Sequence, residues 1–207
     1  MNIYLVRHGQ SEGNLKKFHQ GADVPLSKNG KVQAKILAQR FKKIPVDSIY
    51  SSPYIRAKQT AEFISKELKL PIEYWDILRE RKRPSEIEGL SLDDPKAIKI
   101  NSKVSENLFI PDYKYSDDES FNDLVGRAEK VKRHLLIHHK NQNVVCVSHA
   151  GFTKLLVLSI ILGNMLTPEV FWQFFAHTST ENTGITHLEY TEKYGWRLET
   201  WNDVSHI

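Results

Sequence analysis

Short runs rich in β-branched and aromatic residues alternate along this chain with longer stretches of helical periodicity. The pattern predicts strands at residues 3–6, 46–51, 72–75 and 144–148. It predicts helices that begin near Ser27, Ser52, Ser120, Phe152 and Thr167. Alternating residues on both sides of a turn at 192–195 predict a closing hairpin. This order indicates an α/β fold of three layers, α/β/α, around a mostly parallel sheet that the hairpin makes mixed.

The length of the chain favours one domain. The 207 residues, 40% of them hydrophobic and 26% charged, can bury a substantial core, so we expect a single domain over 1–207 and no intrinsic disorder. Residues 92–119 fit neither the strand nor the helix period and are too many for a plain connection. We predict that they form an inserted cap over one end of the sheet.

Charge and apolar patterning limit where the chain works and what it binds. The longest apolar run, residues 155–162, is far shorter than the roughly 20 residues that span a membrane, and Arg7 interrupts the first apolar run before it can form a signal peptide. The single cysteine, Cys146, lies in an apolar run and cannot form an intramolecular disulfide. We therefore predict a cytoplasmic protein. A net charge of +4 without any block of like charges indicates neither nucleic acid nor membrane as a partner, but it permits anionic substrates.

Polar residues follow three of the predicted strands at the point where each strand ends. Arg7 and His8 follow the first strand, Arg56 follows the second, and His149 follows the fourth. Ligands bind at this edge of such sheets. Two guanidinium groups and a second imidazole around one histidine call for an anion, and a phosphoryl group is the natural one. An unprotonated imidazole can attack phosphorus, which makes His8 the candidate nucleophile.

The leaving oxygen of a phosphate ester needs a proton donor. Glu80, Glu86 and Glu88 all follow the third predicted strand, and only Glu80 stands directly at the strand exit. We take Glu80 as the candidate acid, with Glu86 and Glu88 as alternatives. The neighbouring basic run, 79–83, is either a solvated rim or a selector for a second anionic group on the substrate, with Arg81 as a candidate contact.

These segments together resemble the histidine phosphatase superfamily, also called the phosphoglycerate mutase-like family. The similarity runs in order through most of the chain. Its motifs are Leu5-Val6-Arg7-His8-Gly9 with Asn14, Gly21 with Asp23 and Pro25-Leu26-Ser27, Ser51-Ser52-Pro53 with Arg56, Glu119-Ser120 with Arg127, Val147-Ser148-His149-Ala150-Gly151, and Asn182-Thr183.

The resemblance implies a fold and a set of roles. His8 becomes phosphorylated, and Glu80 is the family's acid. The motif that contains Glu80 departs from the family pattern, which commonly ends in Trp-Glu-Gly where this chain has Ile87-Glu88-Gly89. The implied phosphate and substrate contacts come from Arg7, Asn14, Gly21, Arg56, His149, Ala150 and Gly151.

The expected function is a metal-independent phosphatase that hydrolyses small phosphomonoesters through phosphohistidine. The run Glu80-Arg81-Lys82-Arg83-Pro84 differs from the Glu-Arg-His-Tyr-Gly of the cofactor-dependent mutases, which favours hydrolysis. Phosphoglycerate mutase-type transfer and a non-catalytic phospho-ligand binder remain the alternatives. We expect no cofactor and no metal, because His134 and His138 have no third ligand group in view. The family resemblance allows a monomer or a homodimer.

Overall fold

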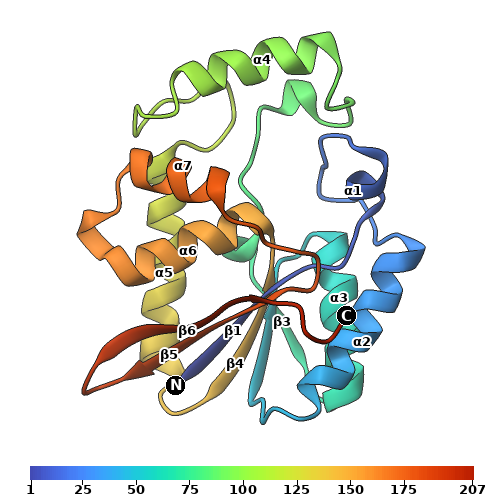
Figure 1. Cartoon of the computed structure of the whole chain (residues 1–207), viewed down its shortest axis with the longest axis vertical. Helices are drawn as coiled ribbons and strands as arrows, with labels where there is room; N and C mark the ends of the chain where they lie inside the picture. The colour runs from blue at the N-terminus through green and yellow to red at the C-terminus, as the bar shows by residue number, and fades with distance from the viewer.

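Six strands form one mixed sheet in the order β3-β2-β4-β1-β5-β6 in a computed structural model that describes residues 1–207 (Figure 1). Its parallel part pairs β4 with both β1 and β2, and β2 with β3. The last two strands are the predicted hairpin, and β5 runs antiparallel to β1. The strands are β1 (Asn2–Arg7), β2 (Ser48–Ser51), β3 (Ile72–Tyr74), β4 (Asn143–Ser148), β5 (Ile185–Thr191) and β6 (Gly195–Asp203).

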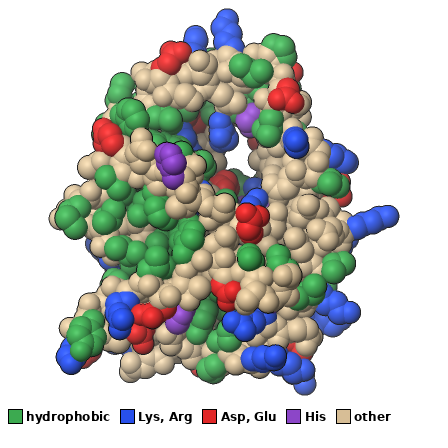
Figure 2. All heavy atoms as spheres, in the orientation of Figure 1, with side chains coloured by type: hydrophobic (Ala, Val, Ile, Leu, Met, Phe, Trp, Pro, Cys, Tyr) green, Lys and Arg blue, Asp and Glu red, His purple; other side chains and the backbone are tan.

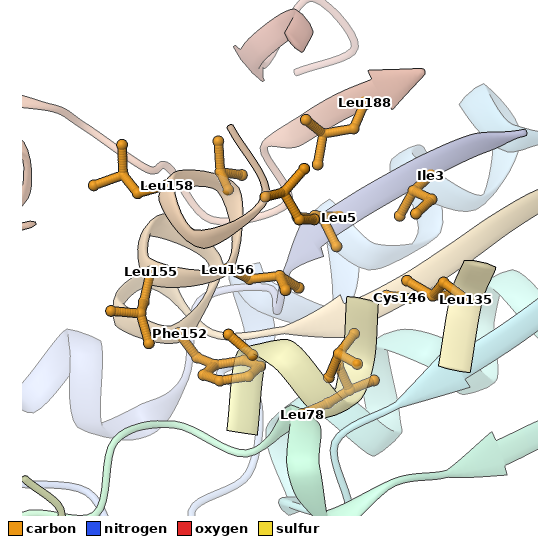
Figure 3. Close-up of a cluster of buried hydrophobic side chains, with 14 of the residues drawn as sticks. Ile3, Leu5, Leu78, Leu135, Cys146, Phe152, Leu155, Leu156, Leu158 and Leu188 are labelled. Carbon is orange, nitrogen blue, oxygen red and sulfur yellow. The ribbon is translucent and has the colours of Figure 1, made fainter. Parts of the chain in front are cut away.

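Helices cover both faces of the sheet, as predicted. On one face lie α2 (Lys28–Phe41) and α3 (Ile55–Leu68), and on the other lie α5 (Phe121–His138) and α6 (Ala150–Leu162), with α7 (Pro168–His177) packed on α6 (Figure 1). Alternation along β4 divides the core, because Cys146 faces α5 and α6 whereas Val145 and Val147 face α2 and α3. Figure 3 shows Leu5, Cys146 and Phe152 in the larger of the two layers.

One helix boundary differs from the prediction. Ser52 does not cap a helix; α3 begins at Ile55 with Tyr54 at its N-cap position and no side-chain capping bond. The backbone stays extended through Ser52 because its N–H donates to the carbonyl of Val147 on the neighbouring strand (2.9 Å). The Ser52 hydroxyl accepts a hydrogen bond from Tyr54 N (3.3 Å) and lies 2.8 Å from Nε2 of His149.

The prediction that residues 92–119 do not follow the helix period is wrong, because this segment contains a helix. This helix, α4 (Pro95–Glu106), begins at an Asp94 cap and packs its few buried residues against Ile87 of the short helix η2 (Ser85–Ile87). It lies apart from the three main layers, at the top of Figure 1. Figure 2 shows a hollow in the surface directly below it.

The remaining helical segments are short: α1 (Glu12–Lys16), η1 (Asp76–Leu78) and η3 (Gly163–Met165). None of the helices combines the length and the apolar composition that crossing a bilayer requires.

Candidate active site

A cavity of about 370 Å³ opens where the parallel strands end. The strand exits predicted from the sequence meet there, joined by α1 and by the segment after η1. Its lining includes Arg7, His8, Asn14, His19, Gly21, Tyr54, Arg56, Glu80, Arg81, Lys82, Arg83, Glu88 and Ala150.

His8 directly follows β1 and is buried. Its Nδ1 lies 2.7 Å from the carbonyl oxygen of Gly9. A carbonyl oxygen only accepts hydrogen bonds, so Nδ1 carries the proton and Nε2 keeps its lone pair. Burial, and then the charges of Arg56 and Arg7, hold the pKa of His8 well below its usual range. The ring is therefore neutral at physiological pH, with Nε2 as its nucleophilic atom.

Arg7 and Arg56 approach the same cavity from β1 and α3. Arg7 donates to the carbonyl of Thr180, and Arg56 donates to the carbonyl of Gly21 (2.7 Å). Neither forms an ion pair with a carboxylate, and the Nε of each is buried without a partner. Two guanidinium groups with unused donors beside a buried neutral histidine make a site for an anion.

His149 lies beside His8, with the ring centroids 5.1 Å apart. Its Nε2 is 2.8 Å from Ser52 Oγ, while Nδ1 is buried without a partner. Burial and the nearby Arg56 hold its pKa well below the usual range, so this ring is also neutral. The side chain is fully buried and does not itself line the cavity.

Glu80 reaches the cavity after η1, and its carboxylate meets the start of α6. Oε2 accepts from Gly151 N (3.0 Å), and Oε1 accepts from Phe152 N (3.0 Å) and Arg81 N (2.9 Å). A Cβ atom at Gly151 would lie 2.7 Å from Oε1. Glycine at this position is what allows the carboxylate to approach the helix.

The two alternative acids lie elsewhere. Glu86 is exposed, accepts a hydrogen bond from Ser116 Oγ (2.9 Å) and does not line the cavity. Glu88 lines the cavity near Gly21, away from the first turn of α6. Of the three glutamates, Glu80 is the one that the structure holds against the segment after His149.

A buried ion-pair network fixes the segment that carries Glu80. Glu119 contacts Arg79 and Arg127, each at 3.0 Å, and its Oε2 accepts from Lys82 N (2.8 Å). Arg127 in turn donates to the carbonyls of Ile77 and Arg79. Glu119 and Arg127 belong to the sequence motifs, but their contact with this segment could not be read from the sequence.

The other predicted contacts are distributed unevenly. Asn14, Gly21 and Ala150 line the cavity, whereas Gly151 lines an adjoining pocket of about 200 Å³. Arg81 lines both, but Asp118 lies 3.7 Å from it and its guanidinium stacks on Trp172.

Several lining residues were not predicted from the sequence, among them Tyr54 and His19. Tyr54 packs its ring 5.2 Å from that of His149 and below the Arg56 guanidinium. His19 also lines the cavity. Tyr54 could have been found, because it lies within the motif that ends in Arg56; His19 carries no local signal.

The neutral buried histidines predict how stability depends on pH. In the unfolded chain each has a pKa of about 6.5, above its folded value, so below that pH the unfolded state binds protons that the folded state refuses. We expect the free energy of unfolding to fall as the pH drops below about 6.5, by about 1.4 kcal/mol per unit for each such histidine. Urea titrations between pH 7.5 and 5 measure it.

The matched variants for this test are His149→Asn and, at an exposed position, His177→Asn. The first should flatten the slope and the second should leave it as in the unmodified protein. An unchanged slope in His149→Asn would show that His149 titrates normally in the folded state.

No group of three or more His, Cys, Asp or Glu side chains comes together as metal ligands would, and His134 and His138 gain no further ligand. The residues that converge at the cavity are thus imidazoles, guanidinium groups and a carboxylate.

Comparison with known proteins places this chain in a family. The model of the histidine phosphatase superfamily (branch 1) matches residues 3–204. The uncharacterized phosphatase PhoE of Bacillus subtilis is 30% identical over 206 residues, with 99% of this chain and 96% of that protein covered. A metal-independent phosphoserine phosphatase of Arabidopsis thaliana is 31% identical over 219 residues, covering 99% and 82%.

The fold agrees with solved structures. A phosphoserine phosphatase mutant from Entamoeba histolytica, in complex with phosphoserine, superimposes with a TM-score of 0.81 at 25% identity, over 100% of this chain and 98% of that one. With its family match over nearly all residues and its phosphoglycerate mutase-like sheet, the chain belongs to the histidine phosphatase superfamily.

Proposed function

We propose that this chain hydrolyses small phosphomonoesters through a phosphohistidine on His8, with Glu80 as proton donor and without a metal ion. The coarser part, that it is a phosphatase and a phosphoric monoester hydrolase of the histidine phosphatase superfamily, follows from the family match and its phosphatase relatives. The observation that supports the finer part most is the free Nε2 of a neutral His8 beside Arg7 and Arg56.

In the first step the Nε2 lone pair of His8 attacks phosphorus. A P–N bond forms while the bond from phosphorus to the ester oxygen breaks, and the electron pair of the broken bond goes to the leaving oxygen. The carboxyl group of Glu80, protonated before this step, gives its proton to that oxygen, so an alcohol leaves. The carboxylate that Glu80 then carries accepts hydrogen bonds from the backbone N–H groups of Arg81, Gly151 and Phe152.

In the second step water attacks the phosphohistidine. The Glu80 carboxylate accepts a proton from the water as its oxygen bonds to phosphorus. The P–N bond breaks, its electron pair returns to Nε2, and phosphate leaves. Glu80 ends protonated and His8 neutral, so the cycle closes without any other reagent.

The surrounding groups stabilise the charge on the transferring phosphoryl group. Arg7 and Arg56 both line the cavity, and neither forms an ion pair with a carboxylate. Asn14, Gly21 and Ala150 line the same cavity and complete the proposed contacts. His149 is fully buried behind the cavity lining, so its contribution is through the neighbouring ring of His8, which it contacts as a neutral group. Together such preorganised donors supply several kcal/mol of barrier lowering.

Two alternatives remain distinct from this proposal. A mutase would return the phosphoryl group to a second substrate rather than to water, and the basic segment 80–84 differs from the mutase sequence. A non-catalytic binder would have no use for the single free ring nitrogen that the Gly9 hydrogen bond leaves on His8. A cytoplasmic location and a monomeric or homodimeric state remain predictions.

Phosphate release in EDTA, over a panel of phosphorylated metabolites and with His8→Ala as the blank, tests the proposal. We expect turnover that EDTA does not reduce and that the variant lacks. Turnover that needs an added metal, or bisphosphate-dependent isomerisation without phosphate release, would overturn it. The Entamoeba histolytica neighbour, in complex with phosphoserine, makes small phosphorylated acids the first compounds to include.

A further inference from the structure

The positively charged side chains that line the cavity fall into two groups, those with a carboxylate partner and those without one. Lys82 forms an ion pair with Asp117 (2.9 Å), and Arg81 lies 3.7 Å from Asp118. Arg7 and Arg56, beside His8, have no such partner and are the proposed phosphate ligands. One cation is left over: Arg83 lines the cavity, forms no ion pair with a carboxylate, and is not needed for the phosphoryl group.

The guanidinium of Arg83 is held in place by neutral groups. It donates to Asn101 Oδ1 of α4 (2.6 Å), and Asn101 Nδ2 lies 3.3 Å from Nε2 of His19. His19 is buried (8% exposed), and burial together with the charge of Arg83 lowers its pKa. Arg83 is thus oriented by the helix above the hollow of Figure 2 without an ion pair, although the charges of Glu80 and Asp118 act on it from farther away.

The cavity has room for more than a phosphoryl group. Its volume of about 370 Å³ lies in the range of roughly 300–1,000 Å³ that encloses whole small molecules. Arg83 also lines the adjoining 200 Å³ pocket with Trp172 and Phe175, so it stands where the leaving group would continue. At that point the exposed guanidinium of Arg83 can donate two parallel hydrogen bonds to a carboxylate or a phosphate.

We propose that Arg83, oriented by Asn101 and His19, binds a second anionic group on the leaving group. Preferred substrates are then phosphomonoesters that also carry a carboxylate or a second phosphate. This inference rests on the proposed function, because it assigns the far end of the same substrate. Arg81 lies beside this site with its guanidinium stacked on Trp172, but Asp118 already forms an ion pair with it.

Three substrates on one carbon frame isolate the second anion. Glycerol 3-phosphate ends in a hydroxymethyl group, 3-phosphoglycerate ends in a carboxylate, and glycerol 1,3-bisphosphate ends in a phosphate. We expect kcat/KM for at least one of the two anionic compounds to exceed that for glycerol 3-phosphate by about 10-fold to 100-fold. The larger ratio tells which anion the site takes.

The variants Arg83→Gln and Arg83→Lys are compared with Arg133→Gln, which removes the same charge from an exposed position on α5 outside the cavity lining. Arg83→Gln should bring the ratio close to one, Arg83→Lys should keep part of it, and Arg133→Gln should keep it whole. A ratio near one in the unmodified protein, or one that survives Arg83→Gln, would overturn the inference. If none of the three compounds is hydrolysed while other members of the phosphomonoester panel are, this inference fails and the proposed function stands; if no member of the panel is hydrolysed, the proposed function fails as well.

Discussion

Replacing His8 with alanine is expected to lower kcat for every phosphomonoester by roughly 10⁵-fold or more. The variant keeps both arginines, so substrate still binds, but no lone pair stands at the attacking position. Water has no group that holds it in line with the ester bond in place of Nε2. Phosphate release under single-turnover conditions, with enzyme in excess, measures the loss without interference from product release.

The fold should survive this change. His8 contributes one hydrogen bond from its ring to the backbone of its own neighbour, Gly9, and one edge contact with the ring of His149. Thermal unfolding should therefore stay cooperative, and His177→Ala, at an exposed helix end, should behave as the unmodified protein in both assays. Substantial turnover by a folded His8→Ala protein would mean that His8 is not the nucleophile.

Replacing Glu80 with glutamine is expected to produce a loss that depends on the leaving group. For alkyl phosphates, whose alkoxide needs a proton to depart, formation of the phosphohistidine should slow by about 10²-fold to 10⁴-fold. For p-nitrophenyl phosphate the leaving anion is stable without a proton, so this step should change little. Stopped-flow measurement of p-nitrophenol release, compared with quenched-flow measurement of alcohol release from an alkyl phosphate, gives both values, because each of these products leaves in the step that forms the phosphohistidine.

Glu119→Gln applies the same leaving-group comparison to the residue that holds the segment carrying Glu80. Glu119 holds the backbone of Lys82 and the guanidinium groups of Arg79 and Arg127, so its loss should displace Glu80. A positioning role predicts a smaller loss with the same dependence on the leaving group. A purely structural role predicts equal losses for both substrates. Glu62→Gln, on the exposed face of α3, controls for the change in charge.

The sequence predicts the fold and the centre of the site because both depend on local patterns. Strands such as β1 and β4 are marked by apolar runs, and the residues that follow them meet at one edge whatever the loops do. The sequence could thus predict that His8 and His149 lie close together, although they are far apart along the chain.

Features set by contacts between distant segments could not be predicted. The start of α3 depends on a backbone hydrogen bond from Ser52 to β4, which no capping pattern encodes. Glu119 holds the segment that carries Glu80, and Asn101 of α4 holds Arg83, so each contact joins residues that are distant in the sequence. The helix α4 had local signals in Asp94 and Pro95, but its apolar stripe is too narrow to stand out because it packs on a small separate cluster.

The phosphohistidine itself is the most direct test of the mechanism. With p-nitrophenyl phosphate, Glu80→Gln should still form the intermediate but should break it down slowly, because water then lacks its base. We expect a burst of p-nitrophenol equal to the enzyme concentration, and a peptide phosphorylated at His8 after alkaline quenching and mass spectrometry. No burst, or a phosphoryl group on any residue other than His8, would contradict the account.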